Sequence, residues 1–282
     1  MNGRETDPLG ADHGRELEIP VFLESPLLAG AGFRHAFFTR RGGVSLPPWD
    51  TLNFAASVGD DPAAVQENLI RAARALGVAE GRLYFLSQVH GVASRAVQGD
   101  EDRAEVVREV GDIVVSATKG VACGVRTADC VPVLIGDRRT HAVAAVHSGW
   151  RGVAQAAVRH GIEALRRLTG GRPEDLVVAV GPHIARCCFE VGDDVARELE
   201  AASSAGSDAS RRVDGSATGK MHVDLRLIVR RQLEACGVAA GAVDDVLGCT
   251  VCDRSSYHSY RRDGAASGRL LSAIVAGPGG AV

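Results

Sequence analysis

The chain has 282 residues, of which 45% are hydrophobic, and a formal net charge of −3 at pH 7. This length and apolar content are enough for one domain of mixed type with a large core. The small negative charge and the lack of a long Lys/Arg run exclude the basic surface that gathers nucleic-acid phosphates. We therefore expect no nucleic-acid partner.

The first eighteen residues mix charged residues with glycine and lack the apolar stretch of a secretory signal or a membrane span. We predict a disordered tail over residues 1–20, one domain over residues 21–282, no membrane association and a cytoplasmic location. The chain has seven cysteines, and two of them, Cys187 and Cys188, are adjacent, which fits a disulfide framework poorly. Reduced thiols are the better interpretation.

Three segments carry helix signals. The first covers residues 61–77, where Asp61 is suited to the N-cap and Pro62 to the first helical position. A second helix is predicted to start at Trp150 and to end at the glycines 170–171, with one apolar stripe along it. A third should run from about residue 224 to 237.

Short apolar runs of strand length alternate with these helices. They cover residues 35–39, 83–89, 112–116, 131–135, 142–146, 176–180 and 270–275. Runs without clean alternation are typical of sheets that are covered on both faces. The stretch Ala202–Lys220, rich in Ser, Gly and Asp, predicts an exposed loop.

Three of the segments that follow apolar runs carry reactive side chains. His90 lies in Ser-Gln-Val-His-Gly, Cys130 in Thr-Ala-Asp-Cys, and His147 in His-Ser-Gly-Trp-Arg-Gly. Two imidazoles and one thiolate are ligands that Zn²⁺ prefers, and three protein ligands leave the fourth tetrahedral position for water or substrate. These three residues would therefore suit one catalytic zinc ion. By spacing alone the alternative stays open that they are ordinary core or surface residues at strand ends.

The segment after His147 also suggests an anion site. A helix predicted to begin within a few residues would direct free backbone N–H groups toward the metal, and Gly149 would let an anion approach the backbone. Arg151, in the first turn, would add a charged contact. We expect phosphate at this turn.

Further short motifs follow one another between residues 33 and 275. They are Thr39–Ser45, Leu52–Asn53, Gln88–Gly91, Thr127–Leu134, His147–Gly152, the stretch from Gly181-Pro182 through Cys188–Val191, and Ser259–Asp263. In this order they closely resemble the YfiH family, which is also called the laccase-domain or polyphenol oxidase family. The resemblance covers nearly the whole predicted domain.

The resemblance implies an α+β fold with mixed β-sheets packed between outer helices. It also implies a zinc-dependent purine nucleoside phosphorylase that deaminates adenosine and cleaves methylthioadenosine. The family's metal ligands fall on His90, Cys130 and His147. His183 stands where the family pattern has a small residue, so we expect the wall of the site to be altered there.

The family's older name raises a multicopper oxidase as an alternative. A trinuclear copper cluster with a blue-copper site needs about ten ligands, mostly histidines in His-x-His pairs. The chain has nine histidines and no such pair. We therefore expect a multicopper cluster to be absent, while copper at the same three ligands, with weak polyphenol oxidase activity, stays open.

A second set of cysteines offers another metal site. Cys249 and Cys252 form a Cys-x-x-Cys unit that, with Cys187 and Cys188, would suit a structural zinc ion. The unit follows an apolar run and is not placed like a redox motif, so we favour packed, reduced cysteines without a metal.

Cys130 also suits a cysteine hydrolase, with His90 or His147 as its base. Two histidines rather than one, and the lack of a Gly-x-Ser/Cys-x-Gly elbow, favour the metal. Asp129 is expected to bind substrate or to orient a ligand.

Arginines in turn-like contexts are candidates for phosphate or ribose contacts, because the guanidinium fork matches both. Arg40, Arg41 and Arg262 have such contexts, and the resemblance favours Arg40. Thr39 and Asn53 are weaker candidates, since both also suit turns.

These observations predict phosphorolysis of adenosine, inosine, guanosine or methylthioadenosine to the base and the sugar 1-phosphate, by a monomer or homodimer. The predicted catalytic residues are Cys130, Asp129 and Arg40. The predicted substrate-binding residues are Arg40, Asn53, Gln88, Thr127, Gly149 and Arg151. Two alternatives are a hydrolase that edits muramyl-peptide precursors through Cys130, and a regulator that binds a metal or nucleotide without catalysis.

Overall fold

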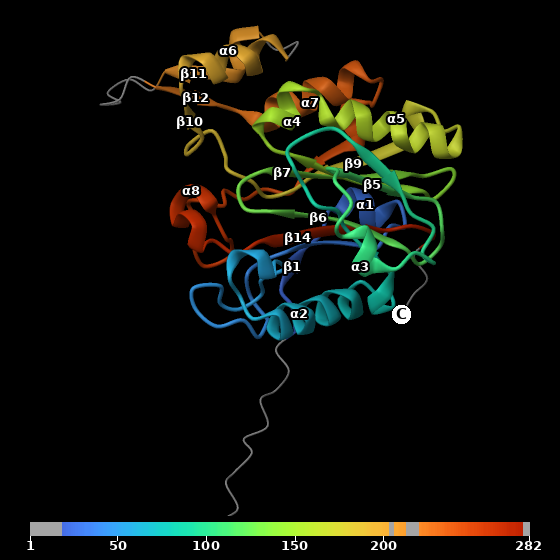
Figure 1. Cartoon of the computed structure of the whole chain (residues 1–282). Coiled ribbons are helices and arrows are strands. Elements are labelled where there is room, and N and C mark those ends of the chain that lie inside the picture. Colours follow the sequence, from blue (N-terminus) through green and yellow to red (C-terminus); the bar gives the residue numbers. More distant parts are fainter. Residues whose placement is uncertain (1–18, 203–205, 213–219, 279–282) are drawn as a thin grey trace, which may run out of the picture.

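A computed structural model describes residues 19–202, 206–212 and 220–278. Residues 1–18 of the predicted tail lie outside these ranges. The described chain forms four layers, in which two stacked β-sheets lie between helices (Figure 1). This confirms the α+β class with mixed sheets between outer helices.

The first sheet has five strands and is mixed. Its order is β1 (Phe22–Leu23), β2 (His35–Phe38), β14 (Leu270–Val275), β6 (Ala122–Thr127) and β3 (Leu83–Tyr84). β14 pairs antiparallel with both β2 and β6, whereas β3 runs parallel to β6. The central strand β14 is buried at every position, which explains its unbroken apolar sequence.

The second sheet has six strands and carries most of the candidate site. Its order is β13 (Val243–Asp245), β9 (Leu176–Val180), β7 (Val131–Asp137), β8 (Val143–Ser148), β5 (Ile113–Ser116) and β4 (Ser94–Ala96). The four central strands β9, β7, β8 and β5 are antiparallel to one another. The two edge strands are parallel to their neighbours, β13 to β9 and β4 to β5. The chain crosses from the first sheet to the second between β6 and β7.

Alternation along the strands divides the core. Leu134 of β7 points between the sheets toward Phe37 of the first sheet, while Val133 and Ile135 point to the helices on the outer face. The outer helices are α2 (Pro62–Ala75) on the first sheet, and α4 (Trp150–Ala154), α5 (Ala157–Thr169) and α7 (Leu225–Ala235) on the second. In the described ranges no helix has the length and apolar character needed to cross a membrane.

Two of the three predicted helices are confirmed with their caps. Asp61 accepts a hydrogen bond from the N–H of Ala63 at the start of α2, and Asp224 caps α7 in the same way. The predicted helix after Trp150 is instead broken into α4 and α5 by Ala156, whose φ is 54°. Leu168, expected inward on the apolar stripe, is 42% exposed in the last turn of α5.

The predicted exposed loop over Ala202–Lys220 is partly wrong. Its described part contains β11 (Ser210–Arg212), which joins a small sheet with β10 (Glu190–Val191) and β12 (Met221–Val223). Ala209, before β11, is fully buried. This small sheet and α6 (Asp193–Ala201) lie at one end of the molecule (Figure 1).

Several short elements complete the chain and had no clear sequence signal. They are α1 (Pro26–Gly30), α3 (Arg103–Val106) and α8 (Tyr260–Asp263). Of these, α8 matters for function because it follows the Cys249–Cys252 loop and borders the pocket described below.

Candidate active site

The three predicted metal ligands come together although they lie on separate elements. Cys130 lies in the crossing between the two sheets, directly before β7, and His147 lies on the neighbouring strand β8. His90 lies in the loop after β3, with a φ of 64°. The ligand atoms of the three residues lie within 4.8 Å of one another, and the Cys130 Sγ is 3.7 Å from the His90 Nε2.

A buried carboxylate, Asp112, organises this group. Its Oδ1 accepts hydrogen bonds from the backbone N–H of His90 at 2.9 Å and from Nδ1 of His147 at 2.7 Å. Its Oδ2 accepts from the N–H of Val89 at 3.2 Å and of Gly91 at 2.8 Å. Because Asp112 holds Nδ1 of His147, the Nε2 of that ring is free to face the metal position.

Burial and charge set the protonation of these residues before any metal binds. Burial would raise the pKa of Cys130, but the positive charge of His147 and hydrogen bonds from both histidines lower it to about 6. Burial would lower the pKa of His147, but the Cys130 thiolate and Asp112 raise it to about 9. Burial would also raise the pKa of Asp112, but its hydrogen bonds with His147 and Gly91 outweigh this effect and hold the pKa below its usual value. A thiolate ligand is therefore available at neutral pH, as metal binding requires.

Gly149 lies directly against two of the candidate ligands. A Cβ at this position would come within 2.5 Å of the His90 Cδ2 and 3.1 Å of the Cys130 Sγ. The helix that begins here, α4, has only 5 residues. The glycine is thus required for packing around the metal position, and its predicted part in an anion site stays a prediction.

The ligands lie at one end of a pocket of about 620 Å³. Its cationic lining consists of Arg126, Arg151, Arg261 and Arg269, and its aromatic lining of Trp150, Phe189 and Tyr260. Thr127, Gln88 and Asp129 also line it, in agreement with their predicted position. The pocket therefore joins a metal centre, positive charge and flat apolar surfaces.

Two of these lining residues, Gln88 and Asp129, already form hydrogen bonds within the protein. Gln88 donates to the carbonyl of Arg126 at 2.7 Å and accepts from its N–H at 2.8 Å. The Asp129 carboxylate accepts from the hydroxyl of Thr250 and the N–H of Arg261, both at 2.6 Å. Asp129 therefore positions the α8 side of the pocket, and its catalytic role stays a prediction.

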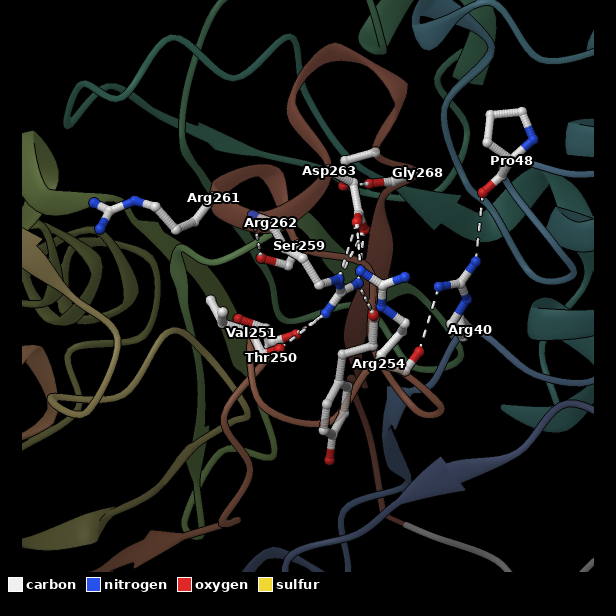
Figure 2. Close-up of polar contacts among 12 residues, drawn as sticks. Arg40, Pro48, Thr250, Val251, Arg254, Ser259, Arg261, Arg262, Asp263 and Gly268 are labelled. Atoms are coloured by element: carbon white, nitrogen blue, oxygen red, sulfur yellow. Dashed lines mark hydrogen bonds and ion pairs between the residues drawn. The ribbon is translucent and has the colours of Figure 1, made fainter.

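Arg40 does not belong to this pocket, contrary to the prediction. It lines a separate hollow with Arg41 and Asp50, and that hollow shares no lining residue with the metal pocket. Its guanidinium donates to the carbonyls of Asp50, Pro48 and Arg254, two of which are drawn in Figure 2. The guanidinium of Arg40 therefore connects the turns around Pro48, Asp50 and Arg254.

Asn53 is also outside the pocket lining, and it is completely buried. Its Oδ1 accepts from the N–H of Ala55 and from the N–H of Arg269 at 2.8 Å, while its Nδ2 donates to Asp60. Asn53 thus fixes the backbone that carries Arg269 and does not reach the substrate space.

Asp112, Arg126 and Arg269 also belong to the site and were not among the residues predicted from the sequence. Arg126 directly precedes the Thr-Ala-Asp-Cys motif, and this was the only local signal for it. Asp112 begins the strand next to β8, so its role follows only from strand pairing. His183, expected to alter the pocket wall, is buried against the Gly181 carbonyl and does not line the pocket, whereas its neighbour Ile184 does.

The two other cysteine pairs lie side by side, and of these four only Cys188 is among the residues that pack against the core. Cys187 and Cys252 are exposed, and Cys188 and Cys249 are half-buried. The packing predicted for the Cys-x-x-Cys unit is therefore not found at the exposed Cys252. Burial would raise the pKa of Cys249, but hydrogen bonds from the N–H groups of Ala185, Cys252 and Val251 lower it to about 7.

Comparison with known proteins assigns the family. The model of the family described as "Multi-copper polyphenol oxidoreductase laccase" matches residues 34–277, and the chain belongs to this family. A purine nucleoside phosphorylase of Mycobacterium tuberculosis is 39% identical over 241 residues, which cover 86% of this chain and 91% of the relative. An adenosine deaminase from an unknown prokaryotic organism is 34% identical over 245 residues, covering 85% and 92%.

A solved structure gives the same result for the fold. The crystal structure of the hypothetical protein YfiH of Bacillus licheniformis matches with a TM-score of 0.84 at 27% identity, covering 93% of this chain and 98% of that one. The resemblance to the YfiH family is thereby confirmed.

The donor set tests which metal chemistry the residues suit. Among the described residues, His90, Cys130 and His147 form the only group of three or more potential ligands that contains histidine. A multicopper cluster needs about ten ligands, mostly histidine, so the described residues do not fit one. Two imidazoles, one thiolate and a side open to the pocket fit a single zinc ion.

Replacing Asp112 with Asn is expected to weaken zinc binding by about 10- to 100-fold, because His147 loses its anionic hydrogen-bond acceptor. Competition with a chromogenic chelator measures the affinity. The unfolding midpoint of the metal-free variant controls for damage to the His90 loop. An unchanged zinc affinity in a stably folded variant would show that Asp112 does not organise the centre.

Proposed function

We propose that this protein is a zinc-dependent purine nucleoside phosphorylase, with His90, Cys130 and His147 as metal ligands. The observation that carries the proposal is a three-ligand centre that opens onto a pocket lined by arginine and aromatic side chains. The relatives named purine nucleoside phosphorylase support the same activity. Inosine, adenosine, guanosine and methylthioadenosine are the proposed substrates.

Arg126 and Arg269 are the best candidates for the phosphate site. Within the described ranges neither guanidinium forms an ion pair with a carboxylate, although both line the pocket. Burial, and then repulsion by Arg269, lowers the pKa of Arg126 to about 10. In the described chain both guanidiniums donate only to backbone carbonyls, Arg126 to Phe54 and Leu86 and Arg269 to Ser267 and Gly268. A bound dianion would remove the repulsion between them and give both a charged acceptor. We therefore assign phosphate to this pair instead of to Arg40 or the Gly149 turn.

Aromatic side chains provide the complementary surface for a purine. Trp150, Phe189 and Tyr260 line the same pocket. Tyr260 is 55% exposed, so its ring is accessible for stacking on a flat base. Arg151 lies over the Trp150 ring at 4.4 Å, which holds its charge at the pocket rim.

In the proposed reaction a phosphate oxygen forms a bond to the sugar C1′ while the bond from C1′ to the base nitrogen breaks. The electron pair of that bond leaves with the base, and the sugar passes through a cation-like state. Arg126 and Arg269 hold the attacking anion on one face, and the negative charge next to C1′ stabilises the transition state. His90, Cys130 and His147 would hold the zinc ion, which would supply Lewis-acid chemistry when bound. Adenosine deamination, supported by the deaminase relative, would use the same pocket with water as the attacking group.

The product identifies the reaction. With inosine and inorganic phosphate, phosphorus NMR should show ribose 1-phosphate appearing in step with hypoxanthine, and omitting phosphate should stop base release. Cys130→Ala should lose both zinc and turnover. Base release that continues without phosphate and yields free ribose would refute phosphorolysis.

Replacing Arg269 with Gln is expected to raise the phosphate KM by about tenfold or more, since a charged hydrogen bond contributes about 1.5–3 kcal/mol. Zinc content should stay unchanged. Arg254→Gln is the matched control, because this exposed arginine lies in the separate hollow. A phosphate KM that moves no more than in the control would exclude Arg269 from the anion site.

One observation supports a second candidate, a cysteine hydrolase. Cys130, His147 and Asp112 form a thiolate, imidazole and carboxylate series, as in a nucleophilic triad. Such an enzyme would edit a peptide-type substrate, as in muramyl-peptide precursors, without phosphate.

Metal removal separates the two candidates. Chelation should abolish activity of the phosphorylase, and added zinc should restore it. A hydrolase would instead gain activity on chelation, because the metal blocks its nucleophile, and iodoacetamide would then inactivate it through Cys130. The second result would replace the phosphorylase proposal.

A further inference from the structure

Four thiols outside the active pocket converge from two distant segments. Cys187 and Cys188 lie between β9 and β10, and Cys249 and Cys252 lie between β13 and α8. The Sγ of Cys187 is 3.6 Å from each of the other three, and Cys188 is 3.4 Å from Cys252. All four sulfur atoms lie within 4.8 Å of one another.

Backbone pairing fixes the two segments relative to each other. His183 and Cys249 form a parallel bridge, in which the N–H of His183 donates to Gly248 and the N–H of Thr250 donates to His183. On the other side, the N–H of Cys188 donates to Ala185 and closes a tight turn. The cysteines are thus presented by ordered backbone and not by chance contact of long side chains.

Arg262 holds the Cys-x-x-Cys loop in its shape (Figure 2). Its guanidinium donates to the carbonyls of Thr250 at 2.7 Å and Val251 at 3.2 Å, the two residues between the cysteines. It also donates to the Tyr257 carbonyl and forms an ion pair with Asp263 at 2.7 Å. Arg262 was a candidate for phosphate in the sequence, and its donors are instead used to shape this loop.

The sulfur separations suit a metal better than a disulfide or a packed core. A disulfide needs sulfur atoms at about 2.05 Å, and all four cysteines are unbonded. Sulfur atoms around a tetrahedral zinc, with bonds of about 2.3 Å, are separated by about 3.8 Å. The observed contacts of 3.4–3.6 Å are close to this value. Exposure of Cys187 and Cys252 leaves an entry path for the ion.

We propose that Cys187, Cys188, Cys249 and Cys252 bind a second, structural zinc ion as four thiolates. Binding releases the thiol protons to solvent, and the N–H groups of Ala185, Val251 and Cys252 that point at the Cys249 sulfur stabilise the anionic cluster. This replaces our sequence-based expectation of cysteines without a metal.

The site would connect two walls of the active pocket. Ile184 and Phe189 flank the first cysteine pair and line the pocket, as does Arg261 after the second pair. Arg261 also donates to the Cys188 carbonyl at 3.1 Å and lies over the Phe189 ring. A metal here would therefore connect the loop before β10 to α8, two segments that both line the pocket.

Metal content tests the proposal on the full-length protein, purified with a reductant and supplied with zinc. The wild type should hold one more zinc equivalent than the double variant Cys249→Ser, Cys252→Ser. Cys236→Ser is the matched control, since this half-buried thiol lies outside the cluster, and it should keep the wild-type content. Equal zinc in the wild type and the double variant would overturn the proposal.

A second measurement keeps the test valid if the double variant fails to fold. Cobalt(II) bound to Cys130→Ala, whose active centre is disabled, should show the intense thiolate charge-transfer bands and the visible bands of a tetrahedral four-sulfur site. The single variant Cys187→Ser in that background should weaken them. Absence of these bands would show that no metal binds at the four cysteines. Thiols that resist alkylation until a reductant is added would show the same, because the cysteines would then form disulfides. These readouts do not depend on nucleoside turnover, so they fail separately from the proposed enzymatic activity.

Discussion

The hydrogen bonds of the Asp112 carboxylate are the interaction on which the candidate centre depends. One buried carboxylate receives three backbone N–H groups from the loop that carries His90 and the ring N–H of His147. It therefore fixes the two histidines relative to each other, although they belong to distant segments. Its charge also balances the imidazolium of His147, which in turn stabilises the thiolate of Cys130. Burying the imidazolium of His147 or the thiolate of Cys130 alone would cost free energy. The carboxylate of Asp112 reduces this cost for the pair.

The stacked sheets explain why the ligands meet. The chain leaves the five-stranded sheet at Thr127 and enters the six-stranded sheet at Val131, and Cys130 lies in this short crossing. Residues opposite one another on β7 and β8 then bring Cys130 next to His147, since Pro132 pairs with His147. His147 lies on a strand and Cys130 directly before one, while the loop before β10 and α8 form another wall of the pocket.

The sequence could predict those parts that depend on residue type or local spacing. His90, Cys130 and His147 could be found because they are residue types that bind zinc and lie in short motifs. The helices α2 and α7 could be found from their cap residues. It could not predict Asp112, because a single Asp before an apolar strand gains its meaning only from strand pairing. Arg40 was misassigned because a turn arginine has the same local sequence whether its donors face substrate or nearby carbonyls. The break at Ala156 was missed because apolar residues keep helical spacing on both sides of it.

We propose two zinc centres in one chain, the first open to the pocket and the second formed by four thiols. Anomalous diffraction from crystals of the zinc-loaded protein, measured on both sides of the zinc absorption edge, tests this most directly. We predict one peak among His90, Cys130 and His147, on the side facing the pocket. A phosphorylase-active crystal that lacks a peak at these three residues would contradict the central claim that this centre carries the catalytic metal.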